Sequence, residues 1–172
     1  MARLRTWICR IATAGLLWST QAYAASPADN LPMLSNLHSD GLRAQDTGKP
    51  IVILFSLPGC PFCHVIRQHY LMPLLRDRKI PEQPILREVD ITSADPVKGF
   101  DNAVTSHQAV AKEFKVWIAP TVVFLDHKGR LLTEPIVGGD TAGMYGGYLD
   151  RAMEEAERKI AARQTNTTRG RP

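Results

Sequence analysis

Residues 51–71 read IVILFSLPGCPFCHVIRQHYL, and no other part of the chain says more about how it folds. The first five residues are apolar and mostly β-branched, which predicts a buried strand. Residues 65–71 are expected to be helical, so Cys60 and Cys63 lie where a strand meets a helix N-terminus. The free N–H groups and partial positive charge there stabilise a thiolate, the reactive form of cysteine. Two cysteines at this spacing can also close a disulfide, and the dipeptide between them can tune how easily that disulfide is reduced.

The start of the chain has the pattern of a cleaved secretory signal. Three arginines precede a short apolar core over 11–18, and a small-x-small cleavage site follows at 22–24. The core is too short to span a bilayer comfortably, which argues against a membrane anchor. We therefore expect residues 1–24 to be a signal peptide and the protein to be exported.

Loss of this segment changes the cysteine count and the charge. Cys9 leaves with the signal, so Cys60 and Cys63 are the two cysteines of the exported protein. Three of the 21 basic residues leave too, and 18 remain against 17 acidic ones, a net charge of +1. This balance gives no basic excess for nucleic acid. Because exported locations permit disulfide chemistry, the lone pair is expected to be a working redox couple.

The remaining chain predicts one domain over 25–163 and a disordered polar tail over 164–172. The sequence predicts helices over 31–46, 61–78, 106–114 and about 140–162, and strands over 51–56, 86–91, 121–125 and 131–137. Ser106 is expected to cap the third helix, and Pro73 to bend or break the second. A turn over 126–130 should join the last two strands into a hairpin. The expected fold class is α/β, with a central mixed sheet of about four strands flanked by helices and closed by a β-hairpin and a C-terminal helix.

Over about residues 31–155 the chain resembles the thioredoxin-fold family. Four features carry the resemblance: Gly59-Cys60-Pro61-Phe62-Cys63 between a strand and a helix, Phe114-Lys115-Val116-Trp117-Ile118-Ala119-Pro120-Thr121 before a strand, the turn at Lys128-Gly129, and Val137-Gly138-Gly139 before an amphipathic helix. A C-x-x-C motif alone is moderately specific, whereas its combination with a later Pro-Thr and strand pair is strongly specific.

The resemblance implies roles for residues outside the cysteine pair. Pro120 is expected to follow a cis peptide bond and to lie against the cysteines, and Ala119 to offer its backbone to a bound substrate strand. Gly138 and Gly139 are expected to form a low rim of the same groove. The residues expected to modulate the two sulfurs are Pro61, Phe62 and His64.

The chain also departs from cytoplasmic thioredoxins. They carry a buried acid six residues before the first cysteine, where this chain has Leu54, and a tryptophan directly before it, where this chain has Gly59. The inner dipeptide looks more like that of glutaredoxins. The connection around residues 97–101 is similar to exported thioredoxin-like proteins, including those linked to sulfur-oxidation systems. The resemblance therefore implies a periplasmic thioredoxin-like thiol:disulfide oxidoreductase, whose proton acceptor for Cys63 the sequence does not name.

The expected mechanism uses the two cysteines and no cofactor beyond their disulfide. Cys60, the more exposed sulfur, attacks a substrate disulfide as a thiolate, and Cys63 then resolves the mixed disulfide. The resemblance favours a reductant over a disulfide-forming oxidant of the same fold. The implied partners are protein thiols or disulfides and a membrane electron-transfer protein for recycling, with the chain itself a monomer and no metal bound.

Two alternatives of other classes stay open. Cys60, Cys63 and His64 form C-x-x-C-H, the attachment pattern of c-type haem, although haem explains neither the preceding strand nor the segment around Pro120. The fold could also serve as a peptide-binding module in which the groove matters and the cysteines do not.

Overall fold

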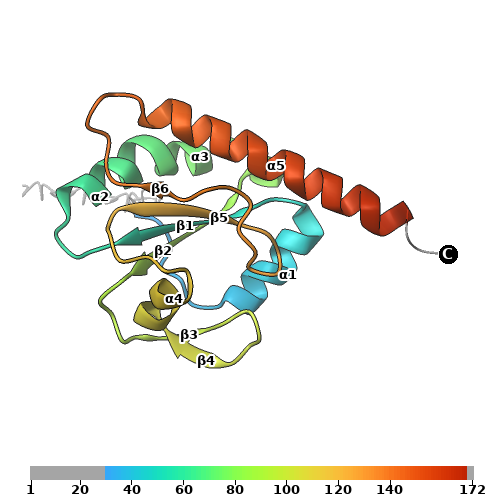
Figure 1. The fold of residues 1–172 in the computed structure, drawn as a ribbon, viewed down its shortest axis with the longest axis horizontal. Helices are drawn as coiled ribbons and strands as arrows, with labels where there is room; N and C mark the ends of the chain where they lie inside the picture. The colour runs from blue at the N-terminus through green and yellow to red at the C-terminus, as the bar shows by residue number, and fades with distance from the viewer. Residues whose placement is uncertain (1–29, 170–172) are drawn as a thin grey trace, which may run out of the picture.

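The computed structural model describes residues 30–169, and the expected signal peptide over 1–24 lies outside them. Its centre is a four-stranded sheet in the order β2-β1-β5-β6 (Figure 1). The strands are β1 Ile51–Ser56, β2 Ile85–Asp90, β5 Thr121–Leu125 and β6 Ile136–Val137. β1 is parallel to β2 and antiparallel to β5, which pairs antiparallel with β6. This mixed sheet confirms the predicted α/β class.

Helices cover both faces of the sheet (Figure 1). One face carries α2 Pro61–Val65, the π-helical segment η1 Ile66–Leu71, α3 Met72–Arg76 and α5 Tyr145–Arg169, and the other carries α1 Leu37–Thr47 and α4 His107–Glu113. Every residue of β1 is buried, because helices pack on both sides of it. Within residues 30–169 no helix combines the length and apolar character needed to cross a bilayer.

The first helix begins later than the leucine spacing predicts. Residues 31–36 run extended along β2, where the N–H of Leu34 donates to the carbonyl of Glu88 at 2.8 Å and the N–H of Glu88 donates to the carbonyl of Pro32 at 2.9 Å. Helix α1 starts only after Asn36, whose side chain accepts from the N–H of Ser39 at 3.0 Å. The buried leucines before α1 therefore face the core from an extended segment that bridges to β2 at Met33 and to β3 at Asn36.

The helix after the cysteines continues past Pro73 and ends at Arg76, two residues earlier than predicted. Pro73 has no N–H and its ring excludes the carbonyl four residues back, so an ordinary α-helix cannot pass through it. The chain widens into a π-helix over Ile66–Leu71, and the N–H of Met72 donates to the carbonyl of Arg67. The predicted break is thus a local change of helix type, and Pro73 lies in the first turn of α3.

The polar connection over residues 92–105 contains a small sheet that the sequence pattern does not predict. β3 Pro96–Lys98 pairs antiparallel with β4 Val104–Ser106. Ser106 ends β4 and also caps α4, since its Oγ accepts from the N–H of Ala109 at 3.2 Å. The predicted cap is confirmed, whereas two strands of three residues are too short to leave a periodic signal.

Two predictions near the C-terminus are wrong. The strand expected over 131–137 is reduced to a bridge at Leu131 and to Ile136–Val137, because Pro135 has no N–H to donate to a ladder. The tail expected to be disordered over 164–172 is helical as far as Arg169, and residues 170–172 are outside the described part. Arg163 supports this end of α5 through an ion pair with the buried Asp126.

Candidate active site

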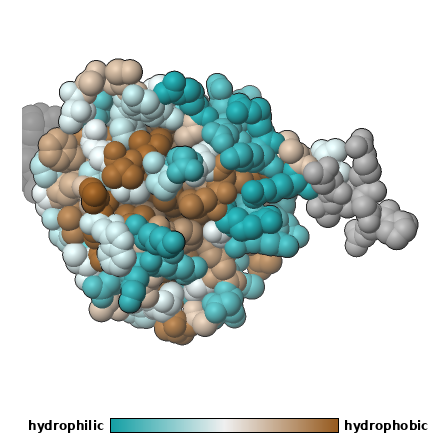
Figure 2. All heavy atoms as spheres, in the orientation of Figure 1, coloured by the Kyte–Doolittle hydropathy of each residue, from teal (hydrophilic) through white to brown (hydrophobic). Residues whose placement is uncertain are grey.

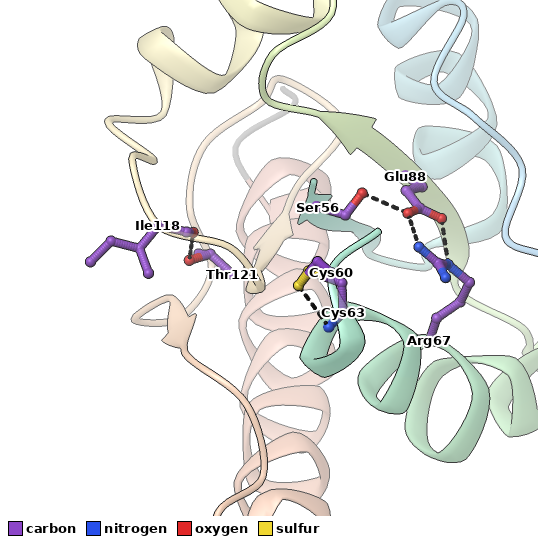
Figure 3. The surroundings of a disulfide bond; sticks show 7 residues. All are labelled: Ser56, Cys60, Cys63, Arg67, Glu88, Ile118 and Thr121. Atoms are coloured by element: carbon purple, nitrogen blue, oxygen red, sulfur yellow. Dashed lines mark hydrogen bonds and ion pairs between the residues drawn. A yellow bond between two sulfur atoms is a disulfide. The ribbon is translucent and has the colours of Figure 1, made fainter. Parts of the chain in front are cut away.

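Cys60 and Cys63 form a disulfide at the N-terminus of α2, with their Cα atoms 5.3 Å apart. Cys60 is the N-cap residue, and its Sγ accepts from the N–H of Cys63 at 3.1 Å (Figure 3). Pro61 occupies the first helical position, where its missing N–H leaves no hydrogen bond unmade. Cys60 is half-buried and Cys63 is fully buried. The site thus has one accessible sulfur beside a free helix N-terminus and one sulfur in the core.

The segment before β5 lies beside the disulfide. The peptide bond between Ala119 and Pro120 is cis, the isomer that the resemblance implies. Pro120 is buried and Ala119 half-buried. The hydroxyl of Thr121 donates to the carbonyl of Ile118 at 2.7 Å, which closes the turn (Figure 3). Ala119 is therefore partly exposed in a turn that is held by the hydrogen bond between Thr121 and Ile118 and by the buried Pro120.

The expected glycine rim meets Phe62 directly. Gly138 has a φ of +93°, and its N–H donates to the carbonyl of Pro120 at 2.8 Å. A Cβ added at Gly139 would lie 2.9 Å from Cδ1 of Phe62, so only glycine fits there without a shift. These contacts place β6 and the start of the following loop against the C-x-x-C motif.

A hydrogen bond that sequence reasoning missed ties this loop to the helix after the cysteines. The hydroxyl of Tyr70 donates to Asp140, and Asp140 also accepts from the N–H of Met144 at 3.1 Å. The hydrogen bond from Tyr70 lowers the pKa of Asp140, and the same bond raises the pKa of Tyr70. Asp140 is thus held as a carboxylate that fixes the loop between β6 and α5.

Large apolar side chains are exposed around the disulfide. Trp117 is 69% exposed and Phe62 is 54% exposed, and both belong to segments that flank the site. Other exposed apolar residues are Ile118 next to Trp117, Val137 in β6, Met144 before α5 and Tyr148 in the first turn of α5. Figure 2 shows hydrophobic surface over the part of the view where α2 and β6 lie, while hydrophilic residues dominate towards the end of α5.

A buried ion pair lies on the opposite side of the disulfide from Ile118 and Thr121 (Figure 3). Arg67 donates from Nε to Oε2 of Glu88 at 2.8 Å and from a second nitrogen to Oε1. The hydroxyl of Ser56 donates to Oε1 at 2.6 Å. These three residues line a cavity of about 470 Å³ together with Cys60 and His64. Sequence reasoning missed all three, because the partner that joins Ser56 and Arg67, Glu88, comes to the cysteines only through the pairing of β2 with β1.

The structure brings together every residue that the sequence singled out near the motif. Cys60, Pro61, Phe62, Cys63 and His64 lie in one turn, and His64 is exposed. Pro120 directly precedes β5 and accepts from the N–H of Gly138, and Gly139 lies against Phe62. Among the described residues, no three His, Cys, Asp or Glu side chains are grouped as a metal ion would require.

A thioredoxin-like domain family matches residues 39–153, which is more than half of the chain. The chain belongs to the thioredoxin-like family. Its cysteine pair, closed as a disulfide at the helix N-terminus, is an arrangement that supports thiol-disulfide oxidoreductase chemistry in general. No curated protein matches the chain significantly.

Several solved structures are similar to this thioredoxin-like protein. A thioredoxin-fold protein from Helicobacter pylori is 17% identical, covers 70% of this chain and 85% of its own, and has a TM-score of 0.44. Thioredoxin O2 from Arabidopsis thaliana in its oxidised state is 21% identical, with 74% and 94% covered and a TM-score of 0.46. The C-terminal domain of DsbD from Neisseria meningitidis in its oxidised form is 19% identical, with 70% and 98% covered and a TM-score of 0.46.

Proposed function

We propose that this protein is a periplasmic thiol:disulfide oxidoreductase that reduces disulfides of other proteins, with Cys60 as nucleophile and Cys63 as resolving thiol. The observation that carries the proposal is the unequal burial of the two sulfurs at one helix N-terminus. A half-buried sulfur can meet a substrate, and the helix N-terminus favours its thiolate. The fully buried sulfur is protected from the substrate and can reach only its partner.

The proposed reaction starts from the dithiol. The thiolate of Cys60 attacks one sulfur of the substrate disulfide, a Cys60–substrate disulfide forms, and the other substrate sulfur leaves as a thiolate that takes a proton. Cys63 then loses its proton and attacks Cys60, which forms the Cys60–Cys63 disulfide and releases the second substrate thiol. Two electrons pass from the protein to the substrate, and a second dithiol must return them before the next cycle.

The substrate is proposed to be an extended protein segment that lies across Pro120 and the glycine rim. Ala119 supplies backbone groups to such a segment, and Gly138 leaves room for it at the other wall, since no atom beyond its chain neighbours lies within 4 Å of a Cβ added there. Exposed Trp117, Ile118 and Phe62 offer apolar contacts on both sides of the sulfurs. An apolar rim around a half-buried sulfur suits a polypeptide better than a small polar disulfide.

The periplasmic location rests on the expected signal peptide over 1–24, and the direction of electron flow on the resemblance to exported thioredoxin-like reductants. Oxidised protein would be reduced again by a membrane electron-transfer protein. We propose that the chain acts as a monomer.

The deciding experiment is the equilibrium reduction potential of the Cys60–Cys63 couple in the purified protein. We expect a value near that of thioredoxin, about −270 mV, as for a reductant. A value near about −120 mV would instead make the protein a disulfide-forming oxidant. If no reversible dithiol couple appeared, the oxidoreductase proposal would fail, and a Soret band in the same sample would identify covalent haem.

Cysteine variants test the two proposed roles. Cys60→Ser is expected to abolish reduction of a protein disulfide, because no nucleophile remains. Cys63→Ser is expected to accumulate mixed disulfides with substrate, since the second step is blocked, and non-reducing gel electrophoresis would detect them. Full activity of Cys60→Ser, or mixed disulfides formed equally through either cysteine, would contradict the assignment.

A further inference from the structure

The Arg67–Glu88 ion pair is the feature near the cysteines that the proposed mechanism does not use. Both side chains are largely buried, with 15% of Arg67 and 6% of Glu88 exposed. Burying two charges costs several kcal/mol each in desolvation, so a pair of this kind is weak evidence for stability alone. Its position beside the only cysteine pair of the described residues therefore calls for a second explanation.

The pair is attached to the active site from both sides. Arg67 follows Cys63 by four residues on the same continuous helical segment, a spacing that brings side chains to adjacent positions. Glu88 is held by Ser56, the last residue of the strand that leads into the cysteine loop. The cavity that these three residues line is also bordered by Cys60. Charges in this cavity thus act on the accessible sulfur through little intervening protein.

Strand register explains why a carboxylate is found here. β1 pairs in parallel with β2 so that Leu54 lies opposite Glu88, and neighbouring residues in register point to the same face of a sheet. Leu54 itself is apolar and fully buried. The buried carboxylate of this chain lies one strand away on the same face, and unlike a lone acid it is neutralised by an arginine.

We propose that the Arg67–Glu88 pair sets the acidity of the active-site thiols by its charge balance. The paired guanidinium and carboxylate nearly cancel, so that the thiolate at Cys60 is favoured mainly by the helix N-terminus. Loss of Glu88 would leave a positive charge that favours the thiolate, whereas loss of Arg67 would leave a negative charge that disfavours it. Arg67 and Glu88 are thus positioning residues that act on the sulfurs through the field in the cavity.

The other charged groups at this cavity belong to two elements. His64 from α2 and Asp90 from β2 line it together with the pair. Imidazole groups in general can change their charge near neutral pH. The titrations below are therefore repeated in a His64→Gln background, in which no imidazole is present at the cavity.

This inference rests on the proposed function, and its test compares the pH dependence of iodoacetamide alkylation at Cys60 in the reduced protein. Glu88→Gln is expected to lower the pH midpoint of thiolate formation at Cys60, and Arg67→Gln to raise it, each by about one pH unit. At a fixed pH below the midpoint, that shift makes alkylation about tenfold faster in the first variant and about tenfold slower in the second.

Asp40 and Arg87 provide the matched control. They form a second bidentate buried ion pair on the other face of the sheet, and Asp40 and Arg87 line no cavity with the cysteines. Asp40→Asn and Arg87→Gln should leave the alkylation midpoint unchanged while breaking an equivalent pair. Equal shifts in the control variants, or shifts of the same sign for Glu88→Gln and Arg67→Gln, would overturn the proposal.

The two single variants are expected to shift the pH midpoint of alkylation in opposite directions. If one of them does not fold, the direction of the shift in the other, compared with its control variant, still tests the proposal. The double variant Arg67→Gln/Glu88→Gln restores neutrality and is expected to return the midpoint towards that of the wild type. A double variant shifted as far as either single one would also overturn the proposal. Failure of this inference is distinguishable from failure of the proposed function, because the latter removes the reversible Cys60–Cys63 couple itself.

Discussion

Arg87 and Glu88 are neighbours on β2, point to opposite faces of the sheet, and each belongs to a buried bidentate ion pair. Arg87 binds Asp40 of α1, and Glu88 binds Arg67 of the helical segment that follows the cysteines. The two carboxylates are equally buried, at 4% and 6% exposed. The same chemistry therefore occurs twice, once remote from the cysteines and once beside them. Beyond the additional hydrogen bond from Ser56 to Glu88, what differs is location, and we infer that location makes one pair structural and the other a determinant of thiol acidity.

The largest expected effect is the loss of either arginine. Arg67→Ala and Arg87→Ala each leave a buried carboxylate without its charged partner, and each is expected to lower the free energy of unfolding by about 3 kcal/mol. Urea denaturation followed by circular dichroism measures both. Similar losses would support the view that the pairs are equivalent in stability. A loss confined to one variant would break the comparison, because the pairs would then differ in more than location.

A smaller loss of stability is expected when either of two glycines is replaced by alanine, one on the α1 side of the sheet and one on the active-site side. A Cβ at Gly41 of α1 would lie 2.7 Å from the carbonyl oxygen of His127, which cannot move freely. A Cβ at Gly139 would meet the side chain of Phe62, which is half-exposed and can shift. We expect Gly41→Ala to cost about 2 kcal/mol and Gly139→Ala about 1 kcal/mol.

The two substitutions are expected to rank in the opposite order by their effect on activity. Gly139→Ala should slow the reaction with a protein disulfide and leave the reaction with a small dithiol unchanged, because only the protein needs the glycine rim. Gly41→Ala should leave both rates unchanged in the folded protein. Insulin reduction compared with dithiothreitol oxidation measures the two reactions. A rate effect at Gly41 equal to that at Gly139 would argue against a groove between Pro120 and the rim.

The smallest effect concerns the pH range in which one ionisable group on each face of the sheet stops contributing to the free energy of unfolding. Burial lowers the pKa of His107 on α4, against the opposing charges of Asp95 and Asp90, so the imidazole is neutral in the folded state. Below about pH 6.5 the unfolded chain takes up the proton first, and stability falls as the pH drops towards the lowered folded pKa. The pKa of Asp140 on the active-site face is lowered by Tyr70, so its contribution is lost only below about pH 3.9.

Thermal unfolding of His107→Gln and Tyr70→Phe at several pH values tests this difference. His107→Gln should flatten the dependence below about pH 6.5, where the unfolded chain begins to take up the proton. On the acid side of neutrality, Tyr70→Phe should change the dependence only below about pH 4. If His107→Gln retained the wild-type profile throughout, the buried imidazole would not be the group that senses acid on that face.

Parts of the chain with strong local patterns were predicted well. The five apolar residues of β1, the N-terminal turn at Cys60-Pro61 and the cap at Ser106 each depend on residues adjacent in sequence. Elements stabilised by distant partners were predicted poorly. Residues 31–36 read as helix by their leucine spacing but pair with β2, and α5 extends beyond its apolar stripe to an end where Arg163 meets Asp126.

The missed ion pair left a weak signal in the sequence. Leu86 and Glu88 alternate on one face of β2, while Arg87 and Val89 alternate on the other. A strand covered by helices on both faces must give every charged residue a partner. The sequence therefore indicates that Arg87 and Glu88 need partners, although it names neither of them.

The sequence by itself determined the fold class, the cysteine pair and the unequal exposure of its two sulfurs, because these follow from residues close together in the chain. Only the tertiary structure decided which charges face the cysteines. Strand register sets Glu88 beside Leu54, and the helix after the motif brings Arg67 across to it. Register and packing are properties of segments that meet only on folding, so no local pattern could place that pair next to Cys60.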